Sequence, residues 1–183
     1  MIKKIVITGG PCAGKTTGLS WIQNSFEKMG CTLLFRQEPA TEMKKAGITP
    51  ARCTSSLAYQ LFQMKLLIEK EDIFEAAARD IEARMRAERQ AAAAEQEEPK
   101  VLIIYDRGFM DNRAYMTDEE FDEALRRLGV TEEERILNYD AVFHLETTAK
   151  NAEIFYGSET NAIRDEDPAA AAALDDRVIA AWS

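Results

Sequence analysis

The sequence has few cysteines and no long apolar run, and these shortages exclude two classes of protein. Cys12, Cys31 and Cys53 lie far apart, without the spacing of zinc ligands or of a redox pair, so neither kind of cysteine centre is expected. An odd number of cysteines is also typical of a reducing compartment. No stretch approaches the roughly 20 apolar residues of a membrane span, and the apolar run near Met1 is too short for a signal peptide. We therefore expect a cytoplasmic protein without a membrane span.

Positive charge is scarce as well. The chain has 23 lysines and arginines against 32 aspartates and glutamates, which gives a formal net charge of −9. Broad contact with nucleic acid or with an anionic membrane requires a basic face, so we expect neither as a partner. Any phosphate group that this protein binds must be captured by a local positive site, because the overall charge repels it.

Four short apolar runs alternate with helical patterns along the 183 residues. The runs predict strands at Lys4–Thr8, Cys31–Phe35, Val101–Tyr105 and Ala141–Leu145. Their apolar residues are continuous rather than alternating, which indicates strands buried on both faces of a mostly parallel sheet. The fold class is therefore α/β, and the alternation predicts a three-layer α/β/α sandwich that forms one domain over residues 1–183.

Helices are predicted between these strands. The segment Lys15–Met29 places apolar residues on one face, and a longer helical region runs over about Ser55–Gln90. Two further helices are expected to begin at capping boxes, which are formed by Thr117 with Glu120 and by Thr131 with Glu134.

The segment from Gly9 to Thr16 fits the phosphate-loop (Walker A) pattern of a glycine, four residues of any type, and Gly-Lys-Thr. It follows a predicted strand and opens a predicted helix, which is the context that this motif requires. The glycines let backbone amides point at phosphates, and the helix adds its positive end. Lys15 is predicted to reach the β- and γ-phosphates of ATP or GTP, and the Thr16 hydroxyl to bind Mg²⁺. The predicted nucleotide-binding residues are Gly9, Gly10, Pro11, Cys12, Ala13, Gly14, Lys15, Thr16 and Thr17.

Asp106 and Arg107 follow the third predicted strand. P-loop proteins hold Mg²⁺ with an acid at the carboxyl end of a neighbouring strand, usually through water, so Asp106 is the second predicted metal residue. Many P-loop ATPases place a glutamate directly after this aspartate to activate water. Arg107 cannot act as a base but can steady phosphate charge, which favours phosphoryl transfer to a bound acceptor over hydrolysis.

Two more residues are candidates for catalysis with Lys15, Asp106 and Arg107. Glu38 follows the second predicted strand, where ligands of open α/β sheets bind. It could accept the proton of an attacking hydroxyl or hydrogen-bond the acceptor, and a solvated loop acid is the alternative. Arg164, in a predicted lid region over residues 146–178, could close over the phosphates, and a surface ion pair is the alternative.

His144 is the only histidine and lies in an apolar strand. We expect it to be a core histidine with one satisfied hydrogen bond rather than a catalytic base.

With these motifs in place, the chain resembles the NadR-like and TRPL-translocation-defect-like group of P-loop proteins, which are often labelled AAA-family ATPases. The matching segments are Ile5–Thr17, Glu38–Thr41, Tyr59–Glu71, Asp106–Met116, Asn138–Leu145 and Asn161–Trp182. More distantly, the Arg-Gln-Glu-Pro and Asp-Arg stretches look like those of thymidylate and deoxynucleoside kinases. The resemblance implies a nucleoside-kinase-like fold that binds ATP or GTP at Lys15 and Thr16, with Asp106–Arg107 in the cleft. Members of the group act on different ligands, so the acceptor does not transfer with the fold.

The chain departs from these relatives near its last residues. They carry a further strand after the tryptophan that corresponds to Trp182, and we expect that final strand to be missing here. The leading hypothesis is a magnesium-dependent phosphotransferase that acts on a small, hydroxyl-bearing, nucleoside-like acceptor of unknown identity. The alternative is a nucleotide-dependent switch or slow NTPase without a small-molecule acceptor.

Overall fold

The computed structural model describes residues 1–11, 13–91, 98, 100–151 and 168–183. Cys12 and Arg164, which the sequence named as candidate site residues, lie outside these ranges. Residues 152–167 of the predicted lid region over residues 146–178 do so as well.

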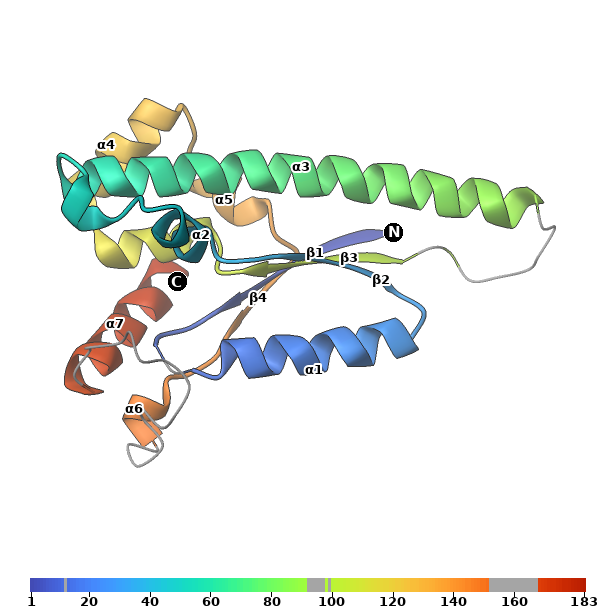
Figure 1. Cartoon of the computed structure of the whole chain (residues 1–183), viewed down its shortest axis with the longest axis horizontal. Helices are drawn as coiled ribbons and strands as arrows, with labels where there is room; N and C mark the ends of the chain where they lie inside the picture. The colour runs from blue at the N-terminus through green and yellow to red at the C-terminus, as the bar shows by residue number, and fades with distance from the viewer. Residues whose placement is uncertain (12, 92–97, 99, 152–167) are drawn as a thin grey trace.

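A parallel sheet of four strands forms the centre of the described fold. The strands are β1 (Ile2–Thr8), β2 (Thr32–Arg36), β3 (Val101–Asp106) and β4 (Ala141–His144), in the spatial order β2-β3-β1-β4. The central strand β1 pairs with β3 and β4, and β3 pairs in turn with β2. Because every pair is parallel, the carboxyl ends of all four strands lie at one end of the sheet (Figure 1).

Helices cover both faces of this sheet and complete the predicted three-layer sandwich (Figure 1). One face buries Ile7 and Ile104 against Leu19 of helix α1 (Lys15–Lys28). The opposite face buries Val6, Val101, Ile103 and Tyr105 against Ala78 and its neighbours in α3 (Ser56–Ala91). This double cover explains the continuous apolar residues of the inner strands β1 and β3. The edge strand β4 differs from the expectation, since Val142 is 37% and Phe143 53% exposed.

The helix α3 is 36 residues long, and its second half is largely solvent-exposed. Its length alone would reach across a bilayer, but its sequence is rich in charged residues. Within the described part of the chain, no helix combines the length and the apolar character that a membrane span needs.

The shorter helices confirm the predicted capping boxes. Thr117 accepts a hydrogen bond from the Glu120 backbone and begins α4 (Asp118–Leu128), and Gly129 ends that helix with φ at 67°. Thr131 and Glu134 form the same reciprocal pair at the start of α5 (Glu132–Leu137). The predicted strands agree with the observed ones to within two residues at either end.

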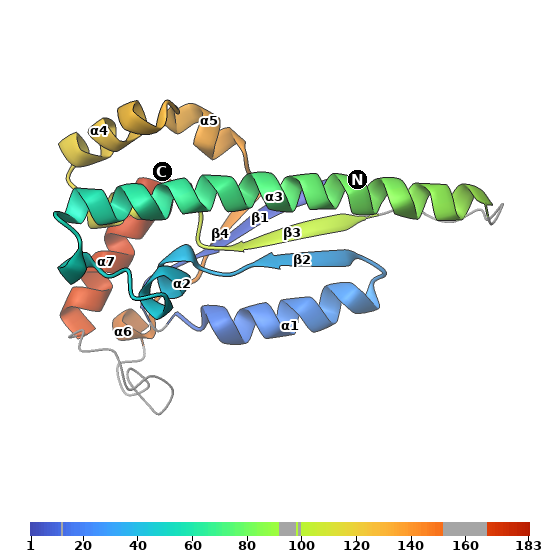
Figure 2. The same cartoon turned by 45° about the horizontal axis from the view of Figure 1, so that its top comes forward.

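The remaining elements gather at the carboxyl end of the sheet, as both views show (Figures 1 and 2). They are α2 (Pro39–Lys45), the 3₁₀ turns η1 (Pro50–Arg52) and η2 (Phe109–Tyr115), α6 (Thr148–Asn151) and α7 (Pro168–Ala181). The helices α6 and α7 of the predicted lid region therefore lie next to the carboxyl ends of the strands. Ligands of open α/β sheets bind at this end.

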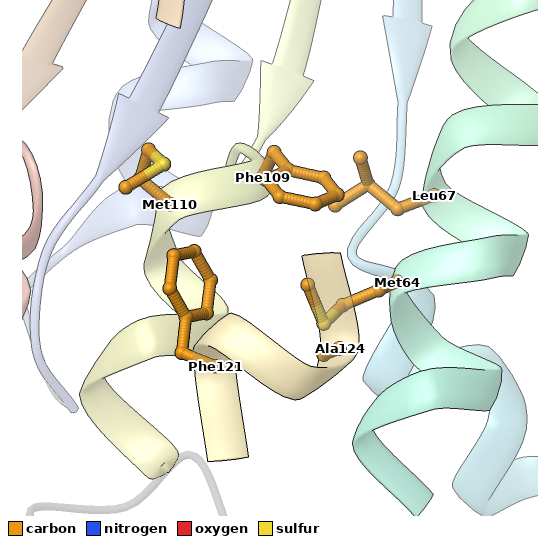
Figure 3. Close-up of a cluster of buried hydrophobic side chains, with 6 residues drawn as sticks. All are labelled: Met64, Leu67, Phe109, Met110, Phe121 and Ala124. Atoms are coloured by element: carbon orange, nitrogen blue, oxygen red, sulfur yellow. The ribbon is translucent and has the colours of Figure 1, made fainter. Parts of the chain in front are cut away.

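A separate apolar cluster holds η2 in place (Figure 3). Phe109 and Met110 of η2 pack between two α3 side chains, Met64 and Leu67, and the α4 residues Phe121 and Ala124. Phe109 and Met110 are fully buried, so η2 starts from a fixed position immediately after β3. The cluster thereby fixes the chain segment that follows Asp106 and Arg107.

We predict that Phe121→Ala lowers the free energy of unfolding by about 3–5 kcal/mol, because it opens a cavity in this cluster. Phe62→Ala is the matched control, since the Phe62 side chain on α3 is 56% exposed, and it should cost less than about 0.5 kcal/mol. Urea unfolding followed by circular dichroism measures both. Equal losses for the two variants would contradict this assignment of the core.

Candidate functional site

The loop between β1 and α1 has the close backbone approach of a phosphate loop. Gly9 has φ at 143°, and a Cβ there would lie 2.1 Å from the carbonyl oxygen of Leu145. Gly14 has φ at 71°, in the left-handed region that favours glycine. The loop ends at Lys15, the first residue of α1, so the helix N-terminus adjoins the loop. The side chains of Thr16 and Thr17 lie outside the described atoms.

Lys15 turns back over this loop. Its Nζ donates hydrogen bonds to the carbonyl oxygens of Gly9, at 2.8 Å, and Gly10, at 2.7 Å. Burial, followed by the positive charge of Arg107, lowers the pKa of Lys15 to about 8, although three nearby carboxylates raise it. An ammonium group that is partly stripped of water and held at the mouth of the loop is a strong local attraction for phosphate oxygens.

Asp106 is the last residue of β3 and carries an unpaired buried oxygen. Its Oδ1 has no hydrogen-bond partner among the described residues. Burial, followed by the charge of Glu38, raises the pKa of Asp106, against the lowering effect of Lys15 and Arg107. A buried carboxylate oxygen of this kind is a suitable ligand for Mg²⁺, directly or through water, so the residues present fit the predicted cation.

Arg107 lies between two carboxylates and does not extend into solvent. Its Nε donates to Glu38 Oε1 at 2.6 Å, and its Nη1 donates to Asp111 Oδ1 at 3.1 Å. Its backbone has φ at 64°, the left-handed region, and its N–H donates to the carbonyl of Ile7 at 2.9 Å. Such a conformation costs a non-glycine residue on the order of 1–3 kcal/mol, which the surrounding contacts must offset.

Asp111, which the sequence reasoning missed, accepts hydrogen bonds from four directions. Besides Arg107, the donors are the Thr8 hydroxyl, the Gly108 N–H at 2.8 Å and the Trp182 Nε1–H at 3.2 Å. Its four donors come from β1, from the turn after β3 and from the chain just after α7. A possible sequence indication was an acid four residues after Arg107, at helical spacing for an ion pair.

Glu38 follows β2 and faces the same cluster. Its second oxygen, Oε2, accepts a hydrogen bond from the Thr41 hydroxyl at 2.7 Å. Burial opposes the ionisation of Glu38, but the charge of Arg107 and the Thr41 hydroxyl together lower its pKa below the ordinary value. The glutamate is therefore an ionised hydrogen-bond acceptor at neutral pH.

A cavity of about 140 Å³ opens between Glu38 and α3. Two buried polar groups of α3 contribute to its wall, and in the described part of the chain the Tyr59 hydroxyl and Gln60 Oε1 have no hydrogen-bond partner. Gln63, one turn further along, donates instead to Asn112 Oδ1 at 2.9 Å. The full lining is Glu38, Pro39, Ala40, Lys44, Pro50, Tyr59, Gln60, Gln63, Leu67, Arg107, Gly108, Asp111, Asn112 and Tyr115. The sequence indication that could have found this pocket was a pair of glutamines three residues apart on a helix face that is otherwise apolar.

Arg36 is only 1% exposed, so it does not end β2 for solubility. Its guanidinium donates to the carbonyl oxygens of Asp106, at 3.2 Å, and Arg107, and lies 5.1 Å from the centre of the Tyr105 ring. It fixes the turn that presents Asp106 and Arg107.

His144 makes one hydrogen bond, as predicted, but it is half-buried at the end of the edge strand β4 rather than in the core. Its Nε2 lies 2.9 Å from Asp175 Oδ1, and Nδ1 has no partner among the residues described here. The partner is a buried aspartate of α7, which the sequence did not single out.

A family model described as AAA domain matches residues 4–183, which is nearly the whole chain. No curated protein matches the sequence. The family match agrees with the parallel sheet and the phosphate loop described above, and it indicates a nucleotide-binding protein of the P-loop type.

We predict that Lys15→Ala weakens the binding of Mg·ATP and Mg·GTP by about 100-fold or more, because the loop loses its only ammonium group. Lys28→Ala is the matched control, since Lys28 ends the same helix and is exposed. Isothermal titration calorimetry gives both affinities. Unchanged affinity of the Lys15 variant in a folded sample would overturn the assignment of the loop.

Proposed function

We propose a phosphotransferase function for this chain, which belongs to the AAA domain family and binds nucleoside triphosphate through its phosphate loop. The γ-phosphate would move to a small, hydroxyl-bearing, nucleoside-like acceptor. The observation that carries the proposal is the polar cavity that opens beside Glu38, Arg107 and Asp111, next to the phosphate loop. An acceptor bound there would replace water in front of the phosphate.

On the donor side, the loop amides and Lys15 would hold the triphosphate. Thr16 and Asp106 would hold Mg²⁺, which neutralises phosphate charge when it is bound. The unpaired Oδ1 of Asp106 supports this role, because without a cation this buried oxygen has no hydrogen-bond partner among the described residues. Arg107 follows Asp106 at the position where many P-loop ATPases carry a water-activating glutamate, and a guanidinium cannot take a proton from water.

On the acceptor side, Glu38 would accept a hydrogen bond from the attacking hydroxyl and so orient it. The hydroxyl oxygen forms the new bond to the γ-phosphorus, the bond to the bridging oxygen breaks, and the nucleoside diphosphate leaves. The hydroxyl proton passes to Glu38 or Asp106. The unpaired Tyr59 hydroxyl and Gln60 Oε1 support a polar acceptor, since its donor groups would satisfy them.

The predicted lid completes this proposal. Within a single domain over residues 1–183, the region 146–178 would carry Arg164 over the phosphates when the ligands bind. The helices α6 and α7, which lie at the carboxyl ends of the strands, support this proposal.

One observation favours the alternative of a nucleotide-dependent switch or slow NTPase. Both oxygens of Glu38 already accept hydrogen bonds, from Arg107 and from Thr41. If these contacts persist when nucleotide binds, Glu38 is a structural anion, and the ordering of the site by nucleotide becomes the functional event.

We predict that Asp106→Asn reduces the magnesium dependence of nucleotide binding. An amide oxygen is neutral and binds Mg²⁺ more weakly than a carboxylate, so the ratio of the ATP dissociation constants measured with EDTA and with Mg²⁺ should fall towards one. Asp122→Asn, on the exposed face of α4, is the control and should keep the wild-type ratio. A wild-type ratio in Asp106→Asn would remove Asp106 from the metal site.

We predict that a hydroxyl-bearing acceptor from a panel of nucleosides and ribosylnicotinamide stimulates release of ADP or GDP by the wild-type protein. Glu38→Gln should lower this stimulated rate by about 10²-fold or more, because the hydroxyl loses its anionic acceptor. Glu42→Gln is the matched control, since Glu42 lies in α2 and pairs with Lys70 on the surface. A coupled diphosphate assay with mass spectrometry of the product measures both.

The same assay separates the two candidate functions. Diphosphate release that no acceptor stimulates, or tight binding without turnover, would reject the phosphotransferase and favour the switch.

A further inference from the structure

The phosphate loop is held from behind by a carboxylate of the C-terminal helix. Asp175 of α7 has no exposed surface, and its Oδ1 accepts a hydrogen bond from the Gly10 N–H at 2.7 Å. The fit is close, since a Cβ at Gly10 would lie 2.8 Å from both Cβ and Oδ1 of Asp175. Glycine at this loop position therefore allows α7 to reach the loop backbone, a task different from the phosphate contacts of the motif.

A carboxylate so near an anion-binding loop must be neutralised by positive groups, because its negative charge would otherwise repel the phosphates. Such groups are present. Lys150 of α6 places its Nζ 2.7 Å from Asp175 Oδ2, and His144 at the end of β4 lies 2.9 Å from Oδ1. Burial raises the pKa of Asp175, but Lys150 and the Gly10 N–H outweigh burial and lower it below the ordinary value. Asp175 is therefore ionised, paired and fixed.

Other contacts on the same side of the loop show that this is a joint between elements. The Thr147 hydroxyl donates to the carbonyl oxygen of Pro11, and the Leu145 carbonyl lies against Gly9. Both residues follow β4, so the loop meets the chain that leads into α6 as well as α7. Among these contacts, the one from Asp175 joins the loop to α7, the C-terminal helix of the predicted lid region.

We propose that Asp175 is a positioning residue that couples the docking of α7 to nucleotide binding at the phosphate loop. With the Gly10 N–H fixed by Asp175, the loop keeps the shape in which its other amides face the phosphates. Coupling of this kind is reciprocal, so bound nucleotide strengthens the docking of α7 by the same factor. The inference rests on nucleotide binding and not on the identity of the acceptor.

Substitutions at two adjacent aspartates test the affinity side of the coupling. Asp175→Ala should weaken binding of Mg·ATP and Mg·GTP by about tenfold or more, because it leaves the Gly10 N–H without its acceptor and Lys150 with only the exposed Asp176. Asp175→Asn keeps an oxygen for the Gly10 N–H and should recover part of this loss. Asp176→Asn is the matched control, since Asp176 also pairs with Lys150 but is exposed and does not contact the loop.

Hydrogen exchange tests the reciprocal side with a readout that a merely structural role would not change. In the wild-type protein and in Asp176→Asn, Mg·ATP should slow amide exchange in residues 168–183. In Asp175→Ala the nucleotide should no longer slow exchange there, even at concentrations that saturate the site. Circular dichroism and thermal unfolding establish that each variant is folded.

A double-mutant cycle covers the case in which Asp175→Ala folds poorly. Gly10→Ala forces its Cβ against Asp175 and so displaces the carboxylate from the Gly10 N–H. Asparagine has the same shape but accepts only a weaker, uncharged hydrogen bond, so Gly10→Ala has less to lose and its effect on nucleotide affinity should be smaller in an Asp175→Asn background than in the wild type. Additive effects in this cycle, or unchanged affinity and unchanged α7 protection in folded Asp175→Ala, would overturn the proposal. A wild-type protein that binds neither triphosphate would instead overturn the proposed function, so the two failures are distinguishable.

Discussion

The buried carboxylate of Asp111 is the constraint on which the rest of the site depends. It is 2% exposed and accepts hydrogen bonds from Thr8, Arg107, Gly108 and Trp182. An ionised carboxylate is tolerated in such a place only if its oxygens are satisfied. Asp111 is therefore satisfied only when the end of β1, the turn after β3 and the residue after α7 all lie next to it. Its charge-assisted hydrogen bonds then hold these three segments together.

The unusual backbone of Arg107 follows from this requirement. Its left-handed conformation directs one side of the guanidinium to Asp111 and the other to Glu38, which follows the neighbouring strand β2. Arg36 stabilises the same turn by binding the carbonyl oxygens of Asp106 and Arg107. The strain is thus offset by ion pairs and hydrogen bonds on both sides. As a result, Asp106 retains a carboxylate oxygen that no described protein group occupies.

The sequence predicted the parts of this site that local chemistry determines. The phosphate loop, Lys15 at the start of α1 and Asp106 at the end of β3 follow from short motifs, and the two capping boxes follow from reciprocal pairs three residues apart. Asp175 was missed because its partners lie far along the chain, and Asp111 because two of its four donors, Thr8 and Trp182, do so. Asp175 lies 165 positions from Gly10, and no periodicity or spacing relates the two. The role of Arg36 was not predicted either, since an arginine at a strand end usually faces water.

The charges of the site also explain how a protein of net charge −9 can bind a polyanion. Lys15 and Arg107 face the carboxylates of Asp106, Glu38 and Asp111, so these side chains together carry a net negative charge. Side-chain attraction alone therefore cannot favour a triphosphate. The remaining positive contributions would come from the loop amides, from the N-terminal end of α1 and from the divalent cation proposed at Asp106. Because the amides contribute only when their directions converge, affinity must depend on the exact backbone shape of the loop, and every contact that fixes this shape from behind acts on nucleotide binding without touching the nucleotide.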